Sequence, residues 1–412
     1  MNKILKQSFI VPILSAGLFF GCTNDSNVEP DVEVNPVSIP TGVSEGTTAF
    51  AFDFLHTLQE TQPTGDNLFV SPLSLHMALG MLLNGAEDET AQEILKTLKM
   101  EGISISDLNN AYKTLINDLP VADSKVSLGL ANSVWYKSGF QVESDFQSVL
   151  KNDFDAEITG LPFDNAAKDK INQWASDKTK GKITKVIDEI SAEQVMFLLN
   201  ALYFKGDWKT QFDSKKTLDA SFKLESGADK TVKMMYAKSD FNVSNAAKYS
   251  AVRLPYANGQ FNMTLLIPKG QNTIDQVLKE LTASQWNELQ STGLKQAVVT
   301  VGLPRFKLDY SGKLNKTLAK MGIEKVFTNA AQLGKINKTA DLFVDFVKQD
   351  AYLGIDEQGT EAAAVTTIGI GLTSVGAEEP RYICDRPFAL MISENTSNTI
   401  LFMGRIKNPD SK

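Results

Sequence analysis

Apolar side chains recur at helical spacing in six stretches of the chain, and we expect a helix in each. The first begins near Thr47, a suitable N-cap, after which Phe50, Phe54 and Leu58 share one face. Pro72 suits the first turn of the second helix. The remaining helices are expected around Ala91 and over 165–178, 274–289 and 314–321.

Continuous or alternating runs of apolar residues predict strands. Residues 126–136 and 194–204 have the character of central strands. Further strand-like segments are 252–254, 261–267, 298–301, 306–308, 342–355 and 388–403. Helices dominate the first half of the chain and strands the second, which predicts an α+β fold.

Residues 357–380 lie between two of these strand-like segments and combine the features of a loop and a strand. From 358 to 379 there is no proline and no aromatic residue, and Glu357 and Glu361 are the only charges before Glu378. Read with the two-residue period of a strand, one face is wholly uncharged: Thr360, Ala362, Ala364, Thr366, Ile368, Ile370 and Leu372. The segment could enter a sheet without burying a charge or losing a ladder donor to proline. The alternative is a bland Gly/Ala/Thr linker.

Short motifs along the chain resemble, in order, those of the serpin family of serine protease inhibitors. EQGTEAAA at 357–364 resembles the serpin hinge, usually written E-x-G-T-E-A-A-A. CDRPF at 384–388, with Leu390, and LFMGR at 401–405 resemble the C-terminal signature and last strand. NLFVSPLS at 67–74, LNALYFKGDW at 199–208, and 306–308 and 321–327 also fit, so the resemblance covers roughly residues 44–412.

The resemblance implies one large serpin-like domain with about nine helices, three β-sheets and an exposed reactive-centre loop over about 357–380. In this family a target protease attacks the loop and forms an acyl-enzyme, after which the loop inserts into the main sheet and traps the enzyme. The hinge would comprise Glu357, Gly359, Thr360, Glu361, Ala362, Ala363 and Ala364.

The cleaved bond in the family normally follows the seventeenth residue counted from the hinge glutamate, which implies Thr373–Ser374 here. Leu372–Thr373 is the nearest alternative, because leucine fills an apolar specificity pocket. No Lys or Arg lies between Lys348 and Arg381, which disfavours trypsin-like targets. Elastase-like, subtilisin-like or chymotrypsin-like serine proteases fit better, and papain-like cysteine proteases are a secondary class.

The resemblance also implies a region where the main sheet parts. Ser71, Ser74 and Asn200 would lie at that point, and Trp208 would lie near the top, where the hinge enters. Many serpins have a histidine that bonds to this asparagine, and Gln349 stands in its place, so a pH-gated opening is not expected. The alternative for these residues is a serine cap, a core asparagine and a packing tryptophan.

The N-terminus has the features of an export signal. Lys3 and Lys6 precede an apolar run over 9–20 that ends at Gly21-Cys22, which resembles a bacterial lipoprotein cleavage site. We expect a signal peptide over 1–21, a disordered tether over 22–46 and the serpin domain over 47–412. Lipidation at Cys22 would anchor the protein to a bacterial membrane, at the outer membrane or cell surface, in a periplasmic or extracellular location. The alternative is an ordinary signal peptide cleaved nearby.

Catalytic and metal-binding motifs are missing from the sequence. His56 and His76 are its only histidines, and a nucleophile site using Ser71 or Ser74 with His76 would need a geometry that one helix cannot supply. We therefore expect no enzyme activity, no cofactor and no metal. If Cys22 is lipidated, Cys384 has no cysteine to pair with. The formal charge of −8 and the mixed Lys, Arg, Asp and Glu argue against a nucleic-acid partner.

The leading interpretation is a monomeric, lipid-anchored inhibitor that forms covalent complexes with proteases. One rival is a non-inhibitory serpin-fold surface lipoprotein with a binding role, although such members usually have proline or charge in the hinge. A rival from another class is a glycan-binding or enzymatic surface lipoprotein, which would require exposed aromatic platforms or paired carboxylates.

Overall fold

Nine α-helices are present in the part of the chain that the computed structural model describes, which comprises residues 35–63, 65, 67–360 and 380–409. They are α1 (Thr41–Thr61), α2 (Pro72–Gly85), α3 (Asp88–Thr97), α4 (Ile105–Asp118), α5 (Ser144–Asp153), α6 (Asn165–Lys178), α7 (Ile274–Glu280), α8 (Ala283–Glu288) and α9 (Asn315–Met321). No helix in these ranges is both long and apolar enough to cross a membrane.

Fifteen strands complete the described structure. They are β1 (Leu68–Val70), β2 (Val126–Lys137), β3 (Glu157–Leu161), β4 (Met196–Asp207), β5 (Leu218–Lys223), β6 (Asp229–Asn245), β7 (Tyr249–Pro255), β8 (Phe261–Pro268), β9 (Lys295–Pro304), β10 (Phe306–Lys313), β11 (Lys348–Ile355), β12 (Gly359–Thr360), β13 (Arg381–Ile383), β14 (Phe388–Glu394) and β15 (Ile400–Ile406).

The strands form two hydrogen-bonded sheets within the described ranges. A six-stranded sheet has the order β10-β11-β12-β4-β2-β3, and a nine-stranded sheet has the order β1-β15-β14-β8-β7-β6-β9-β13, with β5 paired to β6. The three sheets implied by the resemblance are joined into two here, because the 17-residue β6 pairs with β5, β9 and β7 in turn.

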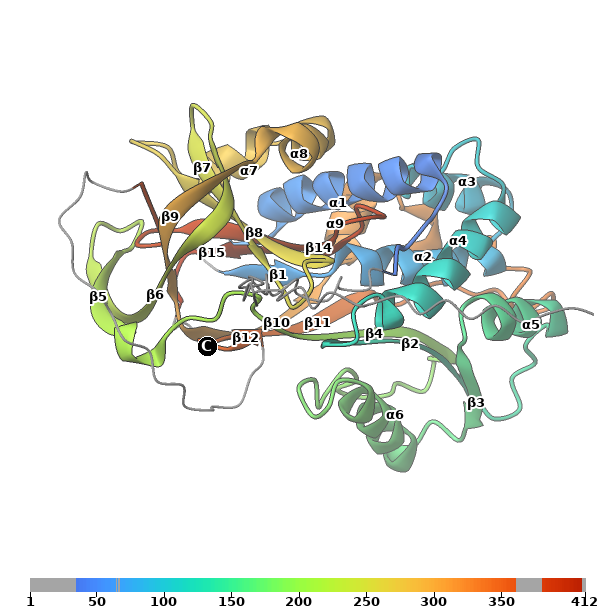
Figure 1. Cartoon of the computed structure of the whole chain (residues 1–412). Helices are drawn as coiled ribbons and strands as arrows, with labels where there is room; N and C mark the ends of the chain where they lie inside the picture. The colour runs from blue at the N-terminus through green and yellow to red at the C-terminus, as the bar shows by residue number, and fades with distance from the viewer. Residues whose placement is uncertain (1–34, 64, 66, 361–379, 410–412) are drawn as a thin grey trace, which may run out of the picture. The chain divides into compact units, whose positions relative to one another are not determined.

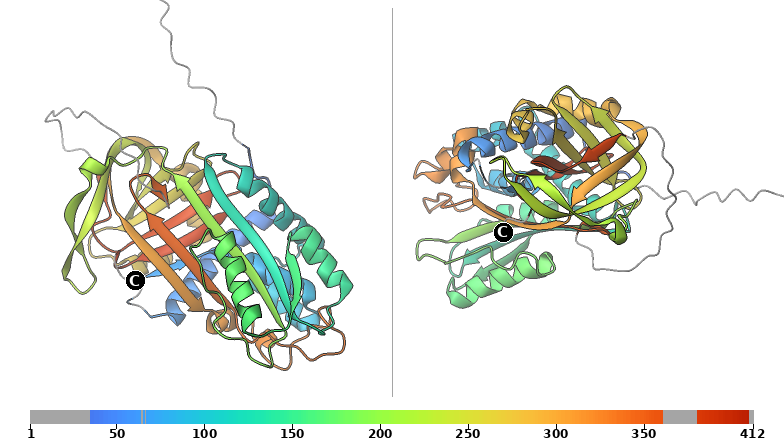
Figure 2. Two further views of the ribbon diagram at one scale, coloured as in Figure 1. Left: turned by 90° about the horizontal axis from the view of Figure 1, so that it is seen from below. Right: turned by 90° about the vertical axis from the view of Figure 1, so that its left-hand side faces the viewer.

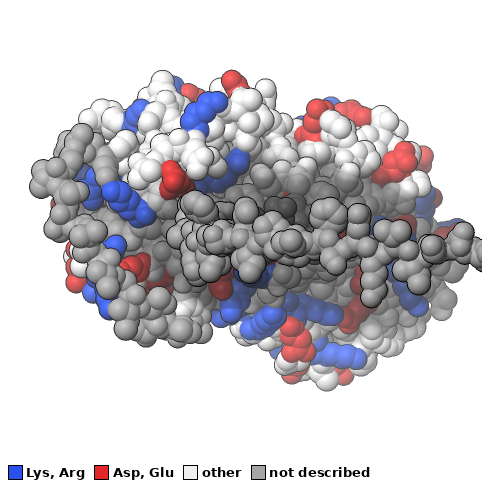
Figure 3. Space-filling model, viewed as in Figure 1, with Lys and Arg blue, Asp and Glu red and all other residues white. Residues whose placement is uncertain are grey.

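Helix α2 lies between the two sheets and contacts both β4 and β15 (Figure 1). It begins where Ser71 caps it, with the Ser71 Oγ accepting a hydrogen bond from Ser74 N at 3.1 Å. The opposite face of the six-stranded sheet is covered by α6, where Ile171 and Trp174 pack on β2 and β4 (Figure 2, left). On the surface seen in Figure 3, basic and acidic side chains are interspersed.

Four predicted boundaries are corrected by the structure. α1 starts at Thr41, after Pro40 and without a side-chain cap, so Thr47 is inside the helix and 41–46 are not a tether. The 274–289 helix is two helices, because Thr282 and Gln285 form a second capping box. The 342–355 strand begins only at Lys348, and 388–403 is a hairpin of β14 and β15.

Candidate functional site

The six-stranded sheet is parted between β4 and β11. At the top of the opening, β12 pairs with both neighbours: Thr360 lies opposite Gly206 of β4 and opposite Ile355 of β11. Below β12, β4 pairs only with β2 and β11 only with β10 among the described strands. Two strand edges therefore face each other across a strip that no described strand fills.

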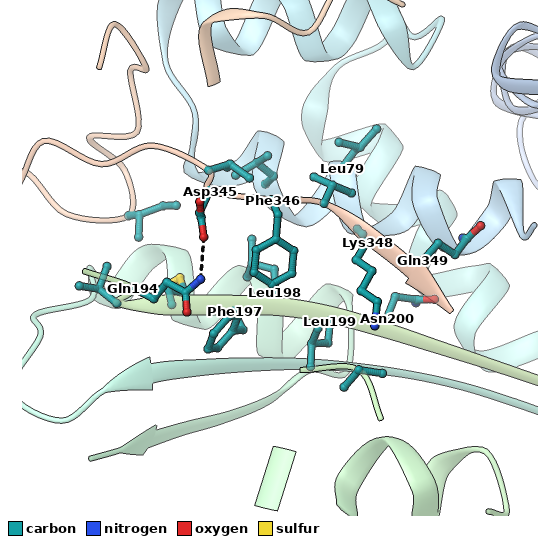
Figure 4. A pocket seen from close by; sticks show the side chains of 18 of the residues that line it. Leu79, Gln194, Phe197, Leu198, Leu199, Asn200, Asp345, Phe346, Lys348 and Gln349 are labelled. Carbon is teal, nitrogen blue, oxygen red and sulfur yellow. Dashed lines mark hydrogen bonds between the residues drawn. The ribbon is translucent and has the colours of Figure 1, made fainter. Parts of the chain in front are cut away.

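A cavity of about 710 Å³ lies at the lower part of this opening (Figure 4). Its walls come from α2, β4 and residues 340–350, and it is mainly apolar, with Leu79, Phe197 and Phe346 in the lining. At one end, Gln194 donates a hydrogen bond of 2.6 Å to Asp345. The sheet opening therefore contains real space between the helix and the strands.

Trp208 holds the hinge at the top of the opening. Its backbone N–H donates to the Gln358 carbonyl at 2.7 Å, and its indole N–H donates to the Asp356 carbonyl at 3.0 Å. Its ring stacks on Tyr256 with a centroid distance of 4.6 Å. The hinge therefore leaves β11 along a fixed path.

The two carboxylates before the hinge have different partners. Asp356 accepts hydrogen bonds from the N–H groups of Gln358 and Gly359, and burial raises the pKa of its carboxyl. Glu357 accepts a 2.7 Å bond from the Thr217 hydroxyl and lies 3.4 Å from Arg305. The two neighbouring carboxylates therefore bind separate partners.

The first hinge residues are already part of the sheet. Thr360 is 3% exposed, and its hydroxyl is 2.6 Å from the Tyr256 hydroxyl, whose pKa is raised by burial. At Gly359 a Cβ would lie 2.1 Å from the Gly206 carbonyl oxygen, so only glycine fits there. The sequence singled out Thr360 but not Tyr256, which is distant in the chain and directly follows the end of β7.

Gln349 bonds to Ser71 rather than to Asn200. Its side-chain N–H donates to the Ser71 carbonyl at 2.8 Å, and its oxygen accepts from the Ser71 N–H at 3.0 Å. An amide carries one donor and one acceptor side by side, which suits both groups of one backbone residue. In this chain, bonds between Gln349 and the Ser71 backbone therefore replace the histidine–asparagine contact typical of the family.

Asn200 lies on β4, across the opening from Gln349 (Figure 4). Its amide donates to Asn132 at 2.7 Å, a residue that sequence reasoning missed. The Asn200 Oδ1 is buried and accepts no hydrogen bond from the described residues. Ser74 lines the same cavity. The structure thus places Ser74, Asn200 and Gln349 around one space, and Ser71 is joined to this group through its bonds to Gln349.

The other candidate groups are accounted for separately. His76 bonds to Tyr112 and to the Leu98 carbonyl, so it activates neither Ser71 nor Ser74. The Cys384 thiol is buried, which raises its pKa. Across the described ranges, no three His, Cys, Asp or Glu side chains are grouped to hold a metal. Cys22 and residues 361–379, which include Glu361, Ala362, Ala363, Ala364, Leu372, Thr373 and Ser374, lie outside those ranges.

Comparisons with known proteins point in one direction. A family model described as "Serpin (serine protease inhibitor)" matches residues 45–409. Leukocyte elastase inhibitors are similar: that of Sus scrofa is 32% identical and that of Xenopus tropicalis 34%, each over 89% of this chain and 99% of the relative.

Solved structures agree with this fold. The native state of the thermophilic serpin tengpin superposes with a TM-score of 0.83 at 28% identity, covering 92% of this chain and 97% of that one. Thyroxine-binding globulin in complex with thyroxine gives 0.81 at 26% identity, covering 89% and 99%.

One expectation from the sequence is corrected by these comparisons. The expectation that the chain has no enzyme activity goes beyond what they show. The family model and the relatives concern inhibition of proteases and carry no positive information about catalysis. The chain is similar to serine protease inhibitors over most of its length.

Proposed function

The chain belongs to the serpin family, and on that premise we propose that it traps proteases by inserting its cleaved loop between β4 and β11. The observation that carries the proposal is β12, which is paired on both sides at the mouth of a parted sheet. A strand that begins there and continues downward would fill the strip between the two edges. β-strand addition of this kind is an established mode of recognition.

The pairing of Thr360 defines where later residues would lie. If the loop continued antiparallel to β4 from the Thr360–Gly206 pair, Ile370 would lie opposite Met196. If it continued antiparallel to β11 from the Thr360–Ile355 pair, Thr367 would lie opposite Lys348. Residues 361–370 would thus span the opening. The uncharged face predicted from the sequence would point to the same side as the buried Thr360, toward α2.

Thr366 would fall at the most polar point of the opening. In both registers it lies opposite the two amides described above, Asn200 on β4 and Gln349 on β11. A threonine hydroxyl can donate to the Asn200 Oδ1, which lacks a described donor. The sequence of the loop therefore matches the polarity of the site it would fill.

The energy for trapping would come from completing the sheet. About ten ladder hydrogen bonds at roughly 0.5–1.5 kcal/mol each amount to the order of 10 kcal/mol. That is comparable to the stability of a whole domain. In the proposed sequence, the protease nucleophile attacks the scissile carbonyl, the leaving amine departs with a proton, and an acyl-enzyme ester forms. Insertion then displaces the protease before water can hydrolyse the ester.

We place the scissile bond at Thr373–Ser374, with Leu372–Thr373 as the alternative. The loop offers threonine or leucine and no basic residue, which supports elastase-like, subtilisin-like or chymotrypsin-like targets, with papain-like cysteine proteases second. The similarity to leukocyte elastase inhibitors supports the same choice.

Incubation with a protease panel tests this proposal. We expect complexes that survive SDS with elastase-like or subtilisin-like enzymes, and cleavage without trapping or no reaction with trypsin. Mass spectrometry of the released peptide should show a start at Ser374, or at Thr373 if Leu372 is read. Cleavage without any stable complex across the panel would refute inhibition and leave the binding role; a start outside residues 369–378 would refute the register.

We further propose that the protein is exported and lipid-anchored through Cys22. The proposal rests on the basic start, the short apolar run and Gly21-Cys22. The described serpin domain would then be held at a bacterial membrane, in the periplasm or outside the cell.

A further inference from the structure

The turn that follows α6 carries two lysines, Lys180 and Lys182, that stand over the outer face of the parted sheet. The Lys180 ammonium lies 5.0 Å from the centroid of the Tyr203 ring and donates a 2.8 Å bond to the Ser127 hydroxyl. The Lys182 ammonium lies 5.0 Å from the centroid of the Tyr352 ring. Cations at this distance over an aromatic face are attracted to it.

The two tyrosines belong to the two strands that flank the opening. Tyr203 is on β4 and Tyr352 is on β11, and both point to the face that α6 covers, away from α2. The turn therefore spans the opening from one edge to the other. It also lies close to the sheet, because a Cβ on Gly129 of β2 would be 3.4 Å from the Lys178 carbonyl.

The backbone of the turn is held in an unusual conformation. Lys180 has a φ of 51° and Gly181 a φ of 79°, so two successive residues are left-handed. For a lysine this conformation is strained relative to the right-handed helix. Gly181 has no side chain, and a Cβ there would meet nothing within 4 Å. The turn thus puts a lysine on each side of a glycine that adds no side chain.

Both strand registers point to the same loop residue beneath this turn. If the loop continued along β4 from the Thr360–Gly206 pair, Ala363 would lie opposite Tyr203. If it continued along β11 from the Thr360–Ile355 pair, Ala363 would lie opposite Tyr352. On the outer face the loop carries Glu361, Ala363, Val365 and Thr367, and the smallest of them is Ala363. The register therefore puts the smallest of these residues between the two rings and under the turn.

We propose that the turn Lys180-Gly181-Lys182 forms a roof over the strip between β4 and β11 into which the loop would insert. The roof restricts loop position 363 to a small side chain. The inference rests on the proposed loop insertion and adds a determinant of which strand can enter. An alanine methyl passes between the rings with both cation–ring contacts kept. A large side chain must lift the turn and break them, which slows entry.

A peptide experiment tests the roof without any protease. An acetylated peptide with the sequence of residues 360–372 is added to the intact protein, and its entry is followed by native gel mobility and by the rise in melting temperature. A second peptide has phenylalanine in place of the alanine at position 363. The proteins are wild type, Lys180→Ala/Lys182→Ala and the control Lys185→Ala, whose lysine is in the same segment but pairs with Asp188.

We expect the phenylalanine peptide to enter the wild type and Lys185→Ala at least about fivefold more slowly than the alanine peptide. In Lys180→Ala/Lys182→Ala the difference should shrink to less than about twofold. Melting temperatures are measured before peptide is added, and a modestly lower value is expected for Lys180→Ala/Lys182→Ala alone, because it loses two cation–ring contacts.

The outcomes separate the two proposals. If the alanine peptide does not enter the wild-type protein, loop insertion itself is refuted, and the roof with it. If it enters and both peptides are equally fast, or if the double variant keeps the full difference, only the roof is refuted. The full-chain variant Ala363→Phe should show the same pattern. More of its molecules should be cleaved for each protease that is trapped, and Lys180→Ala/Lys182→Ala should reverse this increase.

Discussion

At the scale of single residues, His76 shows what tertiary structure adds to a residue that looked unremarkable in the sequence. It is 1% exposed; its Nδ1 accepts a 2.7 Å bond from the Tyr112 hydroxyl, and its Nε2 donates to the Leu98 carbonyl at 3.1 Å. Burial lowers the pKa of His76 from 6.5 to about 4. The folded protein therefore favours the neutral ring.

This pKa predicts a pH-dependent stability. Between pH 6.5 and about 4 the unfolded chain binds a proton at His76 that the folded protein does not, so the stabilisation is complete above 6.5 and falls as the pH falls. The loss is on the order of 3 kcal/mol. Denaturant unfolding from pH 7.5 to 4 should show it in the wild type and in His56→Gln, and a much smaller slope in His76→Gln. Equal slopes in all three would contradict the assignment.

At the scale of elements, local signals predicted some segments well and failed where the deciding contact is distant in the chain. The 165–178 helix was predicted with its observed bounds from its apolar spacing, and the structure adds that Asp164 caps it while Ile171 and Trp174 are buried. The start of α1 was missed because Pro40 provides no capping side chain. A second capping box at Thr282 was present in the sequence but was not recognised.

The candidate site shows the same limit. Its residues were identified by resemblance, but the partner of Gln349 was not, because that contact depends on which backbone lies opposite β11 in the fold. Tyr256, which meets Thr360, and the lysine turn over Tyr203 and Tyr352 join segments far apart in the chain. No local pattern carries that information.

The N-terminal segment gives a prediction at the same scale. Acylation needs the thiol and the amine of a cysteine that becomes the first residue after cleavage, and Cys22 is the only cysteine there. Cys22→Ala should abolish labelling by a fatty-acid probe and shift the protein from the membrane fraction to the soluble fraction. Cys384→Ala, the matched control, should fractionate as wild type. Unchanged fractionation of Cys22→Ala would refute the lipid anchor.

At the scale of the whole molecule, the described strands leave one gap in the six-stranded sheet. A central sheet has two facing edges, a cavity of about 710 Å³ between them and a hinge already paired at the mouth. Backbone groups along such edges gain hydrogen bonds only when another strand arrives. Under the proposed mechanism, the intact protein would hold free energy that a cut in the loop releases.

Thr360→Arg tests this whole-molecule property, because Thr360 is the residue through which the loop enters. An arginine there would be buried against Tyr256 without a counter-charge, which costs several kcal/mol. The hinge should leave the sheet, and the variant should be cleaved as a substrate instead of trapping its protease. Glu361→Arg, one position later on the outer face of the predicted strand, should be much milder.

Melting temperatures then report insertion directly. Completion of the sheet at the order of 10 kcal/mol should make cleaved wild-type protein melt on the order of 20 °C above the intact form. Cleaved Thr360→Arg should gain far less, and cleaved Glu361→Arg should gain nearly as much as wild type. Differential scanning calorimetry before and after limited cleavage measures all three. If Thr360→Arg traps protease at wild-type stoichiometry and gains the full stability on cleavage, the loop does not act by entering between β4 and β11.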